Sequence, residues 1–474
     1  MGHLIAGIER PSADGRVLDN INPWTRQLNG SLARGGAFEA KAAVAAARSA
    51  FDDGPWPRAS EKDRAAVLHR LADLVDAHAE ELADADARDM GRPALAVRSS
   101  DIPRASAMFR FFGDHLTLST SETYPMGAGT HAFAAYRPAG VVLAITPWNV
   151  PLMLGVWKIA PALAWGNTVV WKPAEDSPTS ATLLARLALE AGLPEGVLNV
   201  VHGLGSEIGP ALLEVDGIDR VAFTGSTVTG RLISRTAGER LIPVSLELGG
   251  KGATVVFADA DLELAVETAA RAVFNNSGQV CLACTRLIVQ RSVHDEFLER
   301  LIERARELVV GDPMDGATDL GPLASEKQYE RVLGYFGQAE KDGGRVEVGG
   351  PAGGWAFAPT IVSGLDQSSV VNQEEVFGPV ATVAQFDTLD EALTLANDTV
   401  YGLSSVVFTE SLAQAHTAVS NLRAGTVWVN CYQVRDLRAP FGGGGQSGVG
   451  REGGNFSREF FTEPQAVFLA TALR

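Results

Sequence analysis

The sequence predicts an α/β protein built around a parallel, doubly wound sheet. From about residue 140, short apolar segments of strand length alternate with amphipathic segments of helical spacing. Polar or glycine residues follow several of these apolar segments, as in Asn149, Lys172 and Gly225. Ligands of such sheets bind beyond the carboxyl ends of the strands. We therefore expect the functional residues directly after the strands.

Length and composition narrow the class of protein. A chain of 474 residues exceeds one ordinary core and should form two or more domains. Its 46% hydrophobic and 20% charged residues are typical of a globular protein, and the net charge of −17 argues against nucleic-acid or anionic-membrane partners. Three cysteines cannot form a disulfide framework, and no apolar run reaches a membrane span. We expect a cytoplasmic protein.

The first half opens with two helical stretches. One covers 38–51, and the other follows Ser60, which with Asp63 resembles a capping box. Strands are expected at 141–146, 168–171, 197–201 and 220–223. Ser177 as N-cap and Pro178 at the first helical position should begin a helix that Gly192 ends.

The second half repeats the alternation. Helices are expected at 261–274, 294–309 and 325–341, and strands at 285–290, 380–386, 404–408 and 426–430. The turn at 248–250 marks the domain boundary. The segment 124–136 and the last eighteen or so residues are strand-like but outside the α/β pattern, so they should pair in an edge sheet or an oligomer interface.

Two residues form a candidate catalytic pair. Cys281 lies on a glycine-bearing loop between a helix and a strand, where a cysteine can be exposed and activated. Glu247 lies in an apolar run, and burial raises a carboxyl pKa toward the range of a general base. The alternatives are a cysteine that only fills the core and a glutamate paired with a buried Lys or Arg.

Asn149 stands between Pro147 and Pro151, which hold the backbone on either side of it. A rigid amide is a good oxyanion donor, although an Asn more often stabilises its own turn. Lys172 and Glu175 follow the second strand and can grip ribose hydroxyls, or form a solvated pair.

Two glycine-containing loops are candidates for phosphate binding. The loop 225–230 follows a strand and precedes a helix, so its amides can receive a pyrophosphate. Neither this loop nor Gly203, Gly205 and Gly209 has the usual dinucleotide spacing.

Cys281 and Cys284 also form a C-x-x-C motif. A thioredoxin-type pair opens a helix, whereas a strand is expected here. A zinc site needs four ligands, and Cys431 has no partner of suitable spacing, so we expect no metal.

Seven motifs, in order along the chain, resemble those of the NAD(P)-dependent aldehyde dehydrogenase superfamily. They are PWNVP at 147, KPAE at 172, FTGSTVTG at 223, LELGGK at 246, GQVC at 278, EEVFGPV at 374 and PFGG at 440. The resemblance implies a Rossmann-like parallel-sheet cofactor domain (1–117 and 139–248), an α/β catalytic domain (249–450) and a small β oligomerisation hairpin (118–138 and 451–474). It also implies a homodimer or homotetramer.

The resemblance implies a role for each matching residue. Cys281 attacks the aldehyde to form a thiohemiacetal, whose oxyanion Asn149 and the Cys281 amide stabilise. Hydride transfer to the nicotinamide leaves a thioester, and Glu247 activates the water that hydrolyses it. Glu175 favours NAD, because a carboxylate repels a 2′-phosphate, with NADP as the alternative cofactor. The implied cofactor-binding residues are Thr146, Pro147, Trp148, Lys172, Glu175, Gly205, Phe223, Gly225, Ser226, Leu248, Glu375 and Phe377.

The stretches 102–112, 434–441 and 448–454 resemble the 2-hydroxymuconate semialdehyde dehydrogenase group more closely. Such substrates carry a carboxylate, which arginine grips bidentately. We expect Arg104 and one or both of Arg435 and Arg438 at that carboxylate. The alternative for Arg435 or Arg438 is an ion pair with Asp436. The stretch 442–446 departs from the family, whose members usually carry a bulkier residue and a Lys there. This departure leaves the shape of the substrate-channel rim open, while the chemistry should be retained.

Three other functions are weighed against this one. If the substrate were an uncharged aromatic or aliphatic aldehyde, the arginines would have structural roles only. A non-catalytic binding protein would bind the cofactor without turnover. A thiol–disulfide oxidoreductase would depend on Cys284 as well as Cys281.

Overall fold

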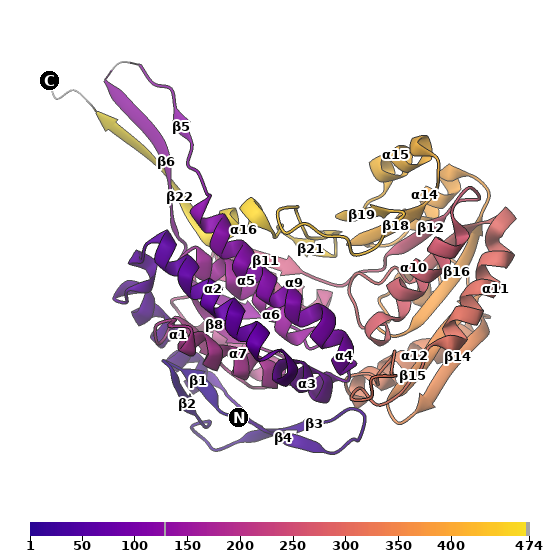
Figure 1. Ribbon diagram of the computed structural model, residues 1–474, viewed down its shortest axis with the longest axis horizontal. Helices are drawn as coiled ribbons and strands as arrows, with labels where there is room; N and C mark the ends of the chain where they lie inside the picture. The colour runs from indigo at the N-terminus through magenta and orange to yellow at the C-terminus, as the bar shows by residue number, and fades with distance from the viewer. Residues whose placement is uncertain (128, 471–474) are drawn as a thin grey trace.

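The computed structural model describes residues 1–127 and 129–470 as two α/β lobes and a projecting β-ribbon (Figure 1). The first lobe holds an eight-stranded sheet in the order β2-β1-β9-β8-β7-β10-β11-β21. Its strands are β1 His3–Ile5, β2 Ile8–Arg10, β7 Val141–Ile145, β8 Thr168–Lys172, β9 Leu198–Val200, β10 Arg220–Thr224, β11 Val244–Glu247 and β21 Gly448–Val449. The five central strands run parallel, which confirms the predicted fold class.

Helices cover both faces of this sheet. Alternate residues of β7 face opposite sides: Val141 and Leu143 join one apolar cluster, and Val142 and Ala144 join another. The helices of this lobe are α1 Ala37–Asp52, α2 Glu61–Ala77, α3 Ala79–Met90, α4 Ala94–Ala96, α5 Ile102–Thr117, α6 Pro151–Ala164, α7 Thr179–Glu190, α8 Gly205–Glu214, α9 Thr227–Glu239 and α16 Gly454–Phe461. A separate hairpin, β3 Val17–Ile21 with β4 Leu28–Ala33, lies beside the N-terminal strands.

The second lobe holds a seven-stranded sheet in the order β14-β15-β16-β13-β12-β18-β19. Its strands are β12 Ala253–Val256, β13 Arg286–Gln290, β14 Arg345–Gly353, β15 Ala356–Ser363, β16 Val380–Phe386, β18 Ser404–Phe408 and β19 Thr426–Val429. Its helices are α10 Leu262–Phe274, α11 Arg291–Glu307, α12 Glu326–Lys341, α13 Val370–Gln373, α14 Leu389–Asn397 and α15 Leu412–Asn421. A short pair, β17 Tyr401–Gly402 with β20 Gly444–Gly445, lies outside both sheets.

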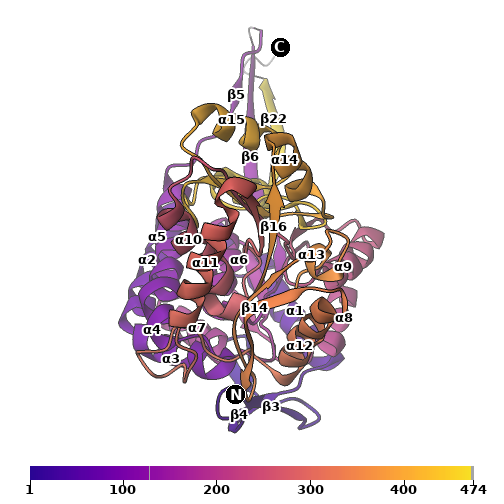
Figure 2. The same cartoon turned by 90° about the vertical axis from the view of Figure 1, so that its right-hand side faces the viewer.

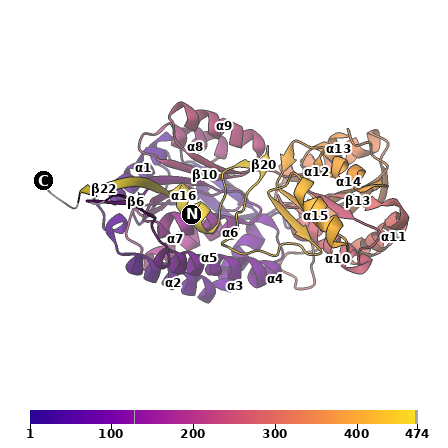
Figure 3. The same cartoon turned by 90° about the horizontal axis from the view of Figure 1, so that it is seen from above.

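The ribbon consists of β5 Thr123–Tyr124, β6 Thr130–Pro138 and β22 Thr462–Ala470. Strand β22 pairs antiparallel with β6 along its whole length, which confirms that the two strand-like segments form an edge sheet. The ribbon extends away from both lobes (Figures 2 and 3). Within the described ranges, none of the helices combines the length and apolar composition needed to span a bilayer.

Two local predictions need correction. Ser177 does not cap α7: no side-chain cap is made, and the carboxylate of Asp89 accepts hydrogen bonds from the Thr179 amide (2.9 Å) and hydroxyl (3.1 Å) instead. The strands β1 to β4, β11, β12, β14 and β15 were not predicted. The domain boundaries stay a prediction, but β21, from the segment assigned to the catalytic domain, pairs with β11 in the first lobe.

Candidate active site

The site begins where the order of the first sheet reverses. Strands β8 and β9 lie on one side of β7, and β10 and β11 lie on the other, so the carboxyl ends of β7 and β10 flank the switch point. Ligands of open α/β sheets bind at this position. The loop that carries Asn149 follows β7, and Gly225 and Ser226 follow β10.

Asn149 connects the first lobe to the turn that precedes Cys281. Its buried Nδ2 donates to the carbonyl of Gln279 (2.8 Å), and Asn276 Nδ2 donates to the Asn149 carbonyl (2.8 Å). A primary amide has two N–H hydrogens, so one is left to donate to an oxyanion. Asn149 therefore does more than stabilise its own turn.

The turn from 275 to 278 is a strained one. Asn276 and Ser277 have left-handed backbone angles (φ 54° and 53°), and Gly278 follows with φ 71°. A Cβ at Gly278 would lie 2.1 Å from the Gly378 carbonyl oxygen, so only glycine fits. Ser277 donates to the Gly321 carbonyl (2.7 Å) and holds the turn in place. Strain of this kind clusters at functional sites.

Cys281, Glu247 and Asn149 line the same open cavity. Their meeting is the arrangement that the sequence predicted. Apolar side chains form much of the remaining wall, namely Val150, Met153, Leu154, Trp157, Val280, Leu282 and Phe441. Arg92, Asp101, Arg104, Thr224, Asn275, Gln433 and Arg435 add polar groups.

Glu247 is buried, and desolvation raises the pKa of its carboxyl to about 8, with the charge of Glu452 acting in the same direction. Lys158 opposes both effects but forms its own buried ion pair with Glu452 (2.5 Å). Glu247 Oε1 has no hydrogen-bond partner among the described residues. A carboxyl group with this pKa and a free oxygen suits a general base near neutral pH.

Cys281 differs from expectation in its protonation. The residue is half-buried, and burial raises the pKa of its thiol to about 12, with the nearby carboxyls of Glu375 and Glu247 adding to the shift. These surroundings do not by themselves activate the thiol, and activation of Cys281 stays a prediction. Attack by the thiolate requires a further positive charge beside it, such as that of an oxidised nicotinamide.

Arginines lie on the wall of this cavity, but not all the expected ones. Arg104 and Arg435 line it, and the Arg435 guanidinium lies 4.6 Å from the centre of the Phe441 ring. Arg438 is not among the lining residues: it is exposed and forms an ion pair with Asp436 (2.6 Å). The structure therefore supports the alternative of an ion pair with Asp436, and contact of Arg438 with a substrate carboxylate stays a prediction without structural support.

A second polar group on the wall was not predicted. Arg92 and Asp101 are both buried and form an ion pair (2.7 Å), and Arg92 also donates to Asn275 Oδ1 (3.4 Å). The Lys158–Glu452 pair was missed as well. The only sequence signal for it is a single lysine inside the apolar helix α6.

The Lys172–Glu175 pair lies at the start of α8. Lys172 Nζ contacts Glu175 Oε2 (2.6 Å), and Glu175 Oε1 accepts a hydrogen bond from the Gly205 amide (3.1 Å). A Cβ at Gly205 would lie 3.4 Å from Lys172 Nζ and 3.8 Å from the Glu175 oxygens. Ser226 caps α9 by accepting from the Thr229 amide (3.2 Å). An adenosine ribose and a pyrophosphate fit these groups.

Glu375 offers a second carboxylate near the turn 248–250. Its Oε1 accepts from the Gly250 amide (2.9 Å), and burial raises its pKa to about 7. A Cβ at Gly249 would lie 2.5 Å from Glu375 Oε2, so glycine keeps this approach open. Phe377 packs edge to face against Trp148 (5.3 Å between ring centres). A dinucleotide with its second ribose at Glu375 fits the residues present.

The stretch 442–446 is not at the rim of the cavity. A Cβ at Gly442 would lie 2.7 Å from Glu247 Oε1, and Gly444 and Gly445 pair with β17. Gln446 accepts a hydrogen bond from Arg231 of α9. The stretch therefore packs beside Glu247 and bridges the two lobes, and its effect on the shape of the substrate channel stays open. Cys284 is buried, with its Sγ 3.7 Å from Ser404 Oγ, which gives no support to a redox pair.

Comparisons with known proteins agree with this geometry. A family model described as "Aldehyde dehydrogenase family" matches residues 10–467. The chain is 44% identical to a 2-hydroxymuconic semialdehyde dehydrogenase of Pseudomonas sp. (strain CF600), over 97% of each chain. It is 42% identical to a 2-aminomuconic semialdehyde dehydrogenase of Danio rerio, over 95% of each. An indole-3-acetaldehyde dehydrogenase solved with NAD+ superimposes with a TM-score of 0.97 at 41% identity, covering 99% of this chain and 97% of that one.

Proposed function

The chain belongs to the aldehyde dehydrogenase family, and we propose that it oxidises a carboxylated semialdehyde of the 2-hydroxymuconate type to the free acid, with NAD as the preferred cofactor. One observation carries the proposal. Arg104 and Arg435 line the same cavity as Cys281, Asn149 and Glu247. A −17 protein needs local cations to bind an anionic substrate, and these two arginines supply them.

The chemistry follows from the positions of the side chains. Cys281 Sγ attacks the aldehyde carbon, and the oxyanion of the resulting thiohemiacetal accepts hydrogen bonds from Asn149 Nδ2 and the Cys281 amide. Loss of one such donor slows acyl-transfer enzymes by about 10²–10³-fold. Bound NAD supplies the hydride acceptor that converts the thiohemiacetal to a thioester.

Glu247 then completes the reaction. Its unpartnered Oε1 accepts a proton from a water molecule, which attacks the thioester and releases the acid with the Cys281 thiol. Lys172, Glu175, Ser226 and Glu375 would hold the cofactor, and Trp148 and Phe377, which contact each other, would lie beside it.

Trapping the acyl-enzyme tests this assignment. Glu247→Gln, mixed with NAD and 2-hydroxymuconate semialdehyde and then acid-quenched, should gain the mass of one substrate acyl group by intact-protein mass spectrometry. Cys281→Ala should gain no mass and form no NADH while still binding NAD. An adduct that forms equally on Cys281→Ala would overturn the nucleophile assignment.

A further inference from the structure

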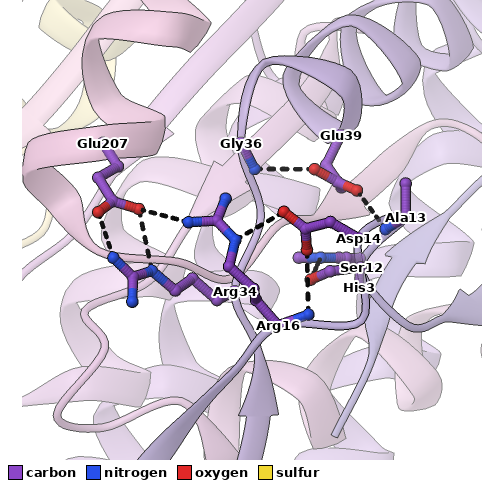
Figure 4. A network of polar contacts seen from close by, with 9 residues as sticks. All are labelled: His3, Ser12, Ala13, Asp14, Arg16, Arg34, Gly36, Glu39 and Glu207. Carbon is purple, nitrogen blue, oxygen red and sulfur yellow. Dashed lines mark hydrogen bonds and ion pairs between the residues drawn. The ribbon is translucent and has the colours of Figure 1, made fainter.

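Two arginines lie beside the adenosine end of the proposed cofactor site and take no part in the chemistry described above. Arg34, after β4, makes a bidentate contact with Glu207 in the first turn of α8 (Nε to Oε2 3.0 Å), as Figure 4 shows. Arg16 approaches the same carboxylate (3.7 Å) and is held by Asp14 (2.6 Å). The hydrogen bond from Arg34 lowers the pKa of Glu207, so this carboxylate is ionised at neutral pH.

These ion pairs adjoin the Lys172–Glu175 clamp. The Gly35 amide donates to the His202 carbonyl (3.0 Å), and a Cβ at Gly203 would lie 3.0 Å from the Gly35 oxygen. The segments 34–36 and 202–205 are therefore in backbone contact. Gly205, at the end of the second segment, donates to Glu175. Glu207 therefore lies in the same first turn of α8 as Gly205, and Arg34 reaches that turn through its contact with Glu207.

The charges in this region balance. Lys172 is neutralised by Glu175, while Arg34 and Arg16 are neutralised by Glu207 and Asp14. A phosphate on the 2′-oxygen would carry about −1.5 to −2 charge at neutral pH. It would meet a carboxylate at Glu175 and find the two nearby guanidiniums already occupied. The Arg34 side chain is 28% exposed and that of Glu207 36%, so their ion pair is partly open to solvent.

We propose that Arg34 is a latent ligand for the 2′-phosphate of NADP and that Glu207, by pairing with Arg34, sets the preference of this enzyme for NAD. The inference rests on the proposed function for the location of the adenosine ribose. It goes beyond that proposal, because it assigns discrimination between the cofactors to a residue pair outside the Lys172–Glu175 clamp. Arginine binds phosphate through two parallel hydrogen bonds, so a freed Arg34 is well suited to this role.

Binding of two mononucleotides tests the proposal without turnover. Isothermal titration calorimetry would compare 5′-AMP with 2′,5′-ADP, which differ only in the 2′-phosphate. For Glu207→Gln, we expect 2′,5′-ADP to bind about 5- to 10-fold more tightly than to wild type, with 5′-AMP unchanged within about twofold. The gain should disappear in the Glu207→Gln/Arg34→Gln double variant and shrink as salt is added.

Glu9→Gln is the matched control. Glu9 pairs with Arg186 (2.6 Å) through the same Glu–Arg chemistry at a similarly exposed site of the same lobe. The Glu9→Gln variant should bind both nucleotides with the affinity of wild type. If Glu207→Gln binds 5′-AMP normally but gains nothing for 2′,5′-ADP, or if the double variant keeps the gain, the proposal is wrong. If wild type binds neither nucleotide, the cofactor site of the proposed function fails instead.

Discussion

At the scale of single residues, the protonation of Glu247 depends on a neighbour distant in the sequence. Glu452 lies beside Glu247 and is joined to Lys158, 294 residues away. The negative charge of Glu452 adds to desolvation and raises the pKa of Glu247 to about 8. The Glu247 carboxyl is therefore mostly protonated at pH 7, and the deprotonated fraction that can act as a base grows as the pH rises toward 8.

This protonation predicts a pH dependence for hydrolysis. A base must be deprotonated to act, so the rate of thioester hydrolysis should rise about tenfold per unit below pH 8 and level off above it. Glu247→Gln should lose this rise together with most of the rate. Glu452→Gln removes the repelling charge and leaves Lys158, so the rise should move to lower pH. For wild type and the two variants, stopped-flow spectroscopy would measure the steady-state rate that follows the NADH burst as a function of pH. The same pH–rate profile for all three proteins would contradict the role of Glu247.

The sequence was sufficient to select candidate catalytic residues that lie together in the fold, but it did not reveal their surroundings. Cys281, Glu247 and Asn149 stand in motifs whose order is itself informative, and all three meet in one cavity. Sequence could not tell which of Arg435 and Arg438 faces the cavity, because the two lie on one irregular loop and only the fold shows that Asp436 pairs with Arg438. The raised pKa of the Cys281 thiol depends on desolvation by residues from several elements, which no local pattern reveals.

At the scale of elements, the strained turn between α10 and β13 sets the position of the nucleophile. Gly278→Ala would place a Cβ 2.1 Å from a backbone oxygen at φ 71°. We expect a loss of about 2–4 kcal/mol in the free energy of unfolding and a larger fractional loss of activity. Thermal unfolding and initial rates measure the two effects.

Gly334→Ala is the control for this substitution. Gly334 lies in α12, and its added Cβ would meet no atom within 4 Å. Replacing a helical glycine by alanine stabilises by about 0.5–1 kcal/mol. If the two variants behaved alike, the turn would not constrain Cys281 as described.

The strands and helices that were predicted within the α/β alternation are confirmed, because period-2 and period-3.6 patterns report burial directly, but other elements of the alternation, such as β12, were not predicted. The strands β1 to β4 were missed, since only β1 is buried throughout and a short exposed strand has little apolar pattern. The predicted cap of α7 was wrong for a related reason. The carboxylate that accepts the hydrogen bond from the Thr179 amide belongs to Asp89, which lies 90 residues earlier on another helix. Left-handed angles at Asn276 and Ser277 likewise have no signature in residue type alone.

At the scale of the whole molecule, the β5–β6–β22 ribbon leaves large apolar side chains exposed. Phe468 and Leu469 on β22 are 65% and 50% exposed, and the ribbon projects from the first lobe, away from the second (Figure 1). An apolar projecting strand of this kind is suited to pairing with another copy of the chain. The dimer or tetramer expected from the sequence stays a prediction.

Substitution within the ribbon tests that expectation. Phe468→Asp with Leu469→Asp should lower the molar mass measured by light scattering, because two charges would be buried on assembly. Ile8→Asp, at an exposed apolar position on β2, should leave the mass unchanged. An unchanged mass for the ribbon variant would place the subunit interface elsewhere.

The most direct test of the proposed substrate is a comparison of NADH formation from 2-hydroxymuconate semialdehyde, benzaldehyde and hexanal. Wild type, Arg104→Ala, Arg435→Ala and the exposed control Arg438→Ala would be assayed for kcat/KM. We predict that wild type prefers the semialdehyde by about 100-fold or more, that Arg104→Ala and Arg435→Ala each lose about 10- to 100-fold on it alone, and that Arg438→Ala matches wild type. Equal rates with uncharged aldehydes, or losses shared by all three substrates, would contradict recognition of a carboxylate by this cavity.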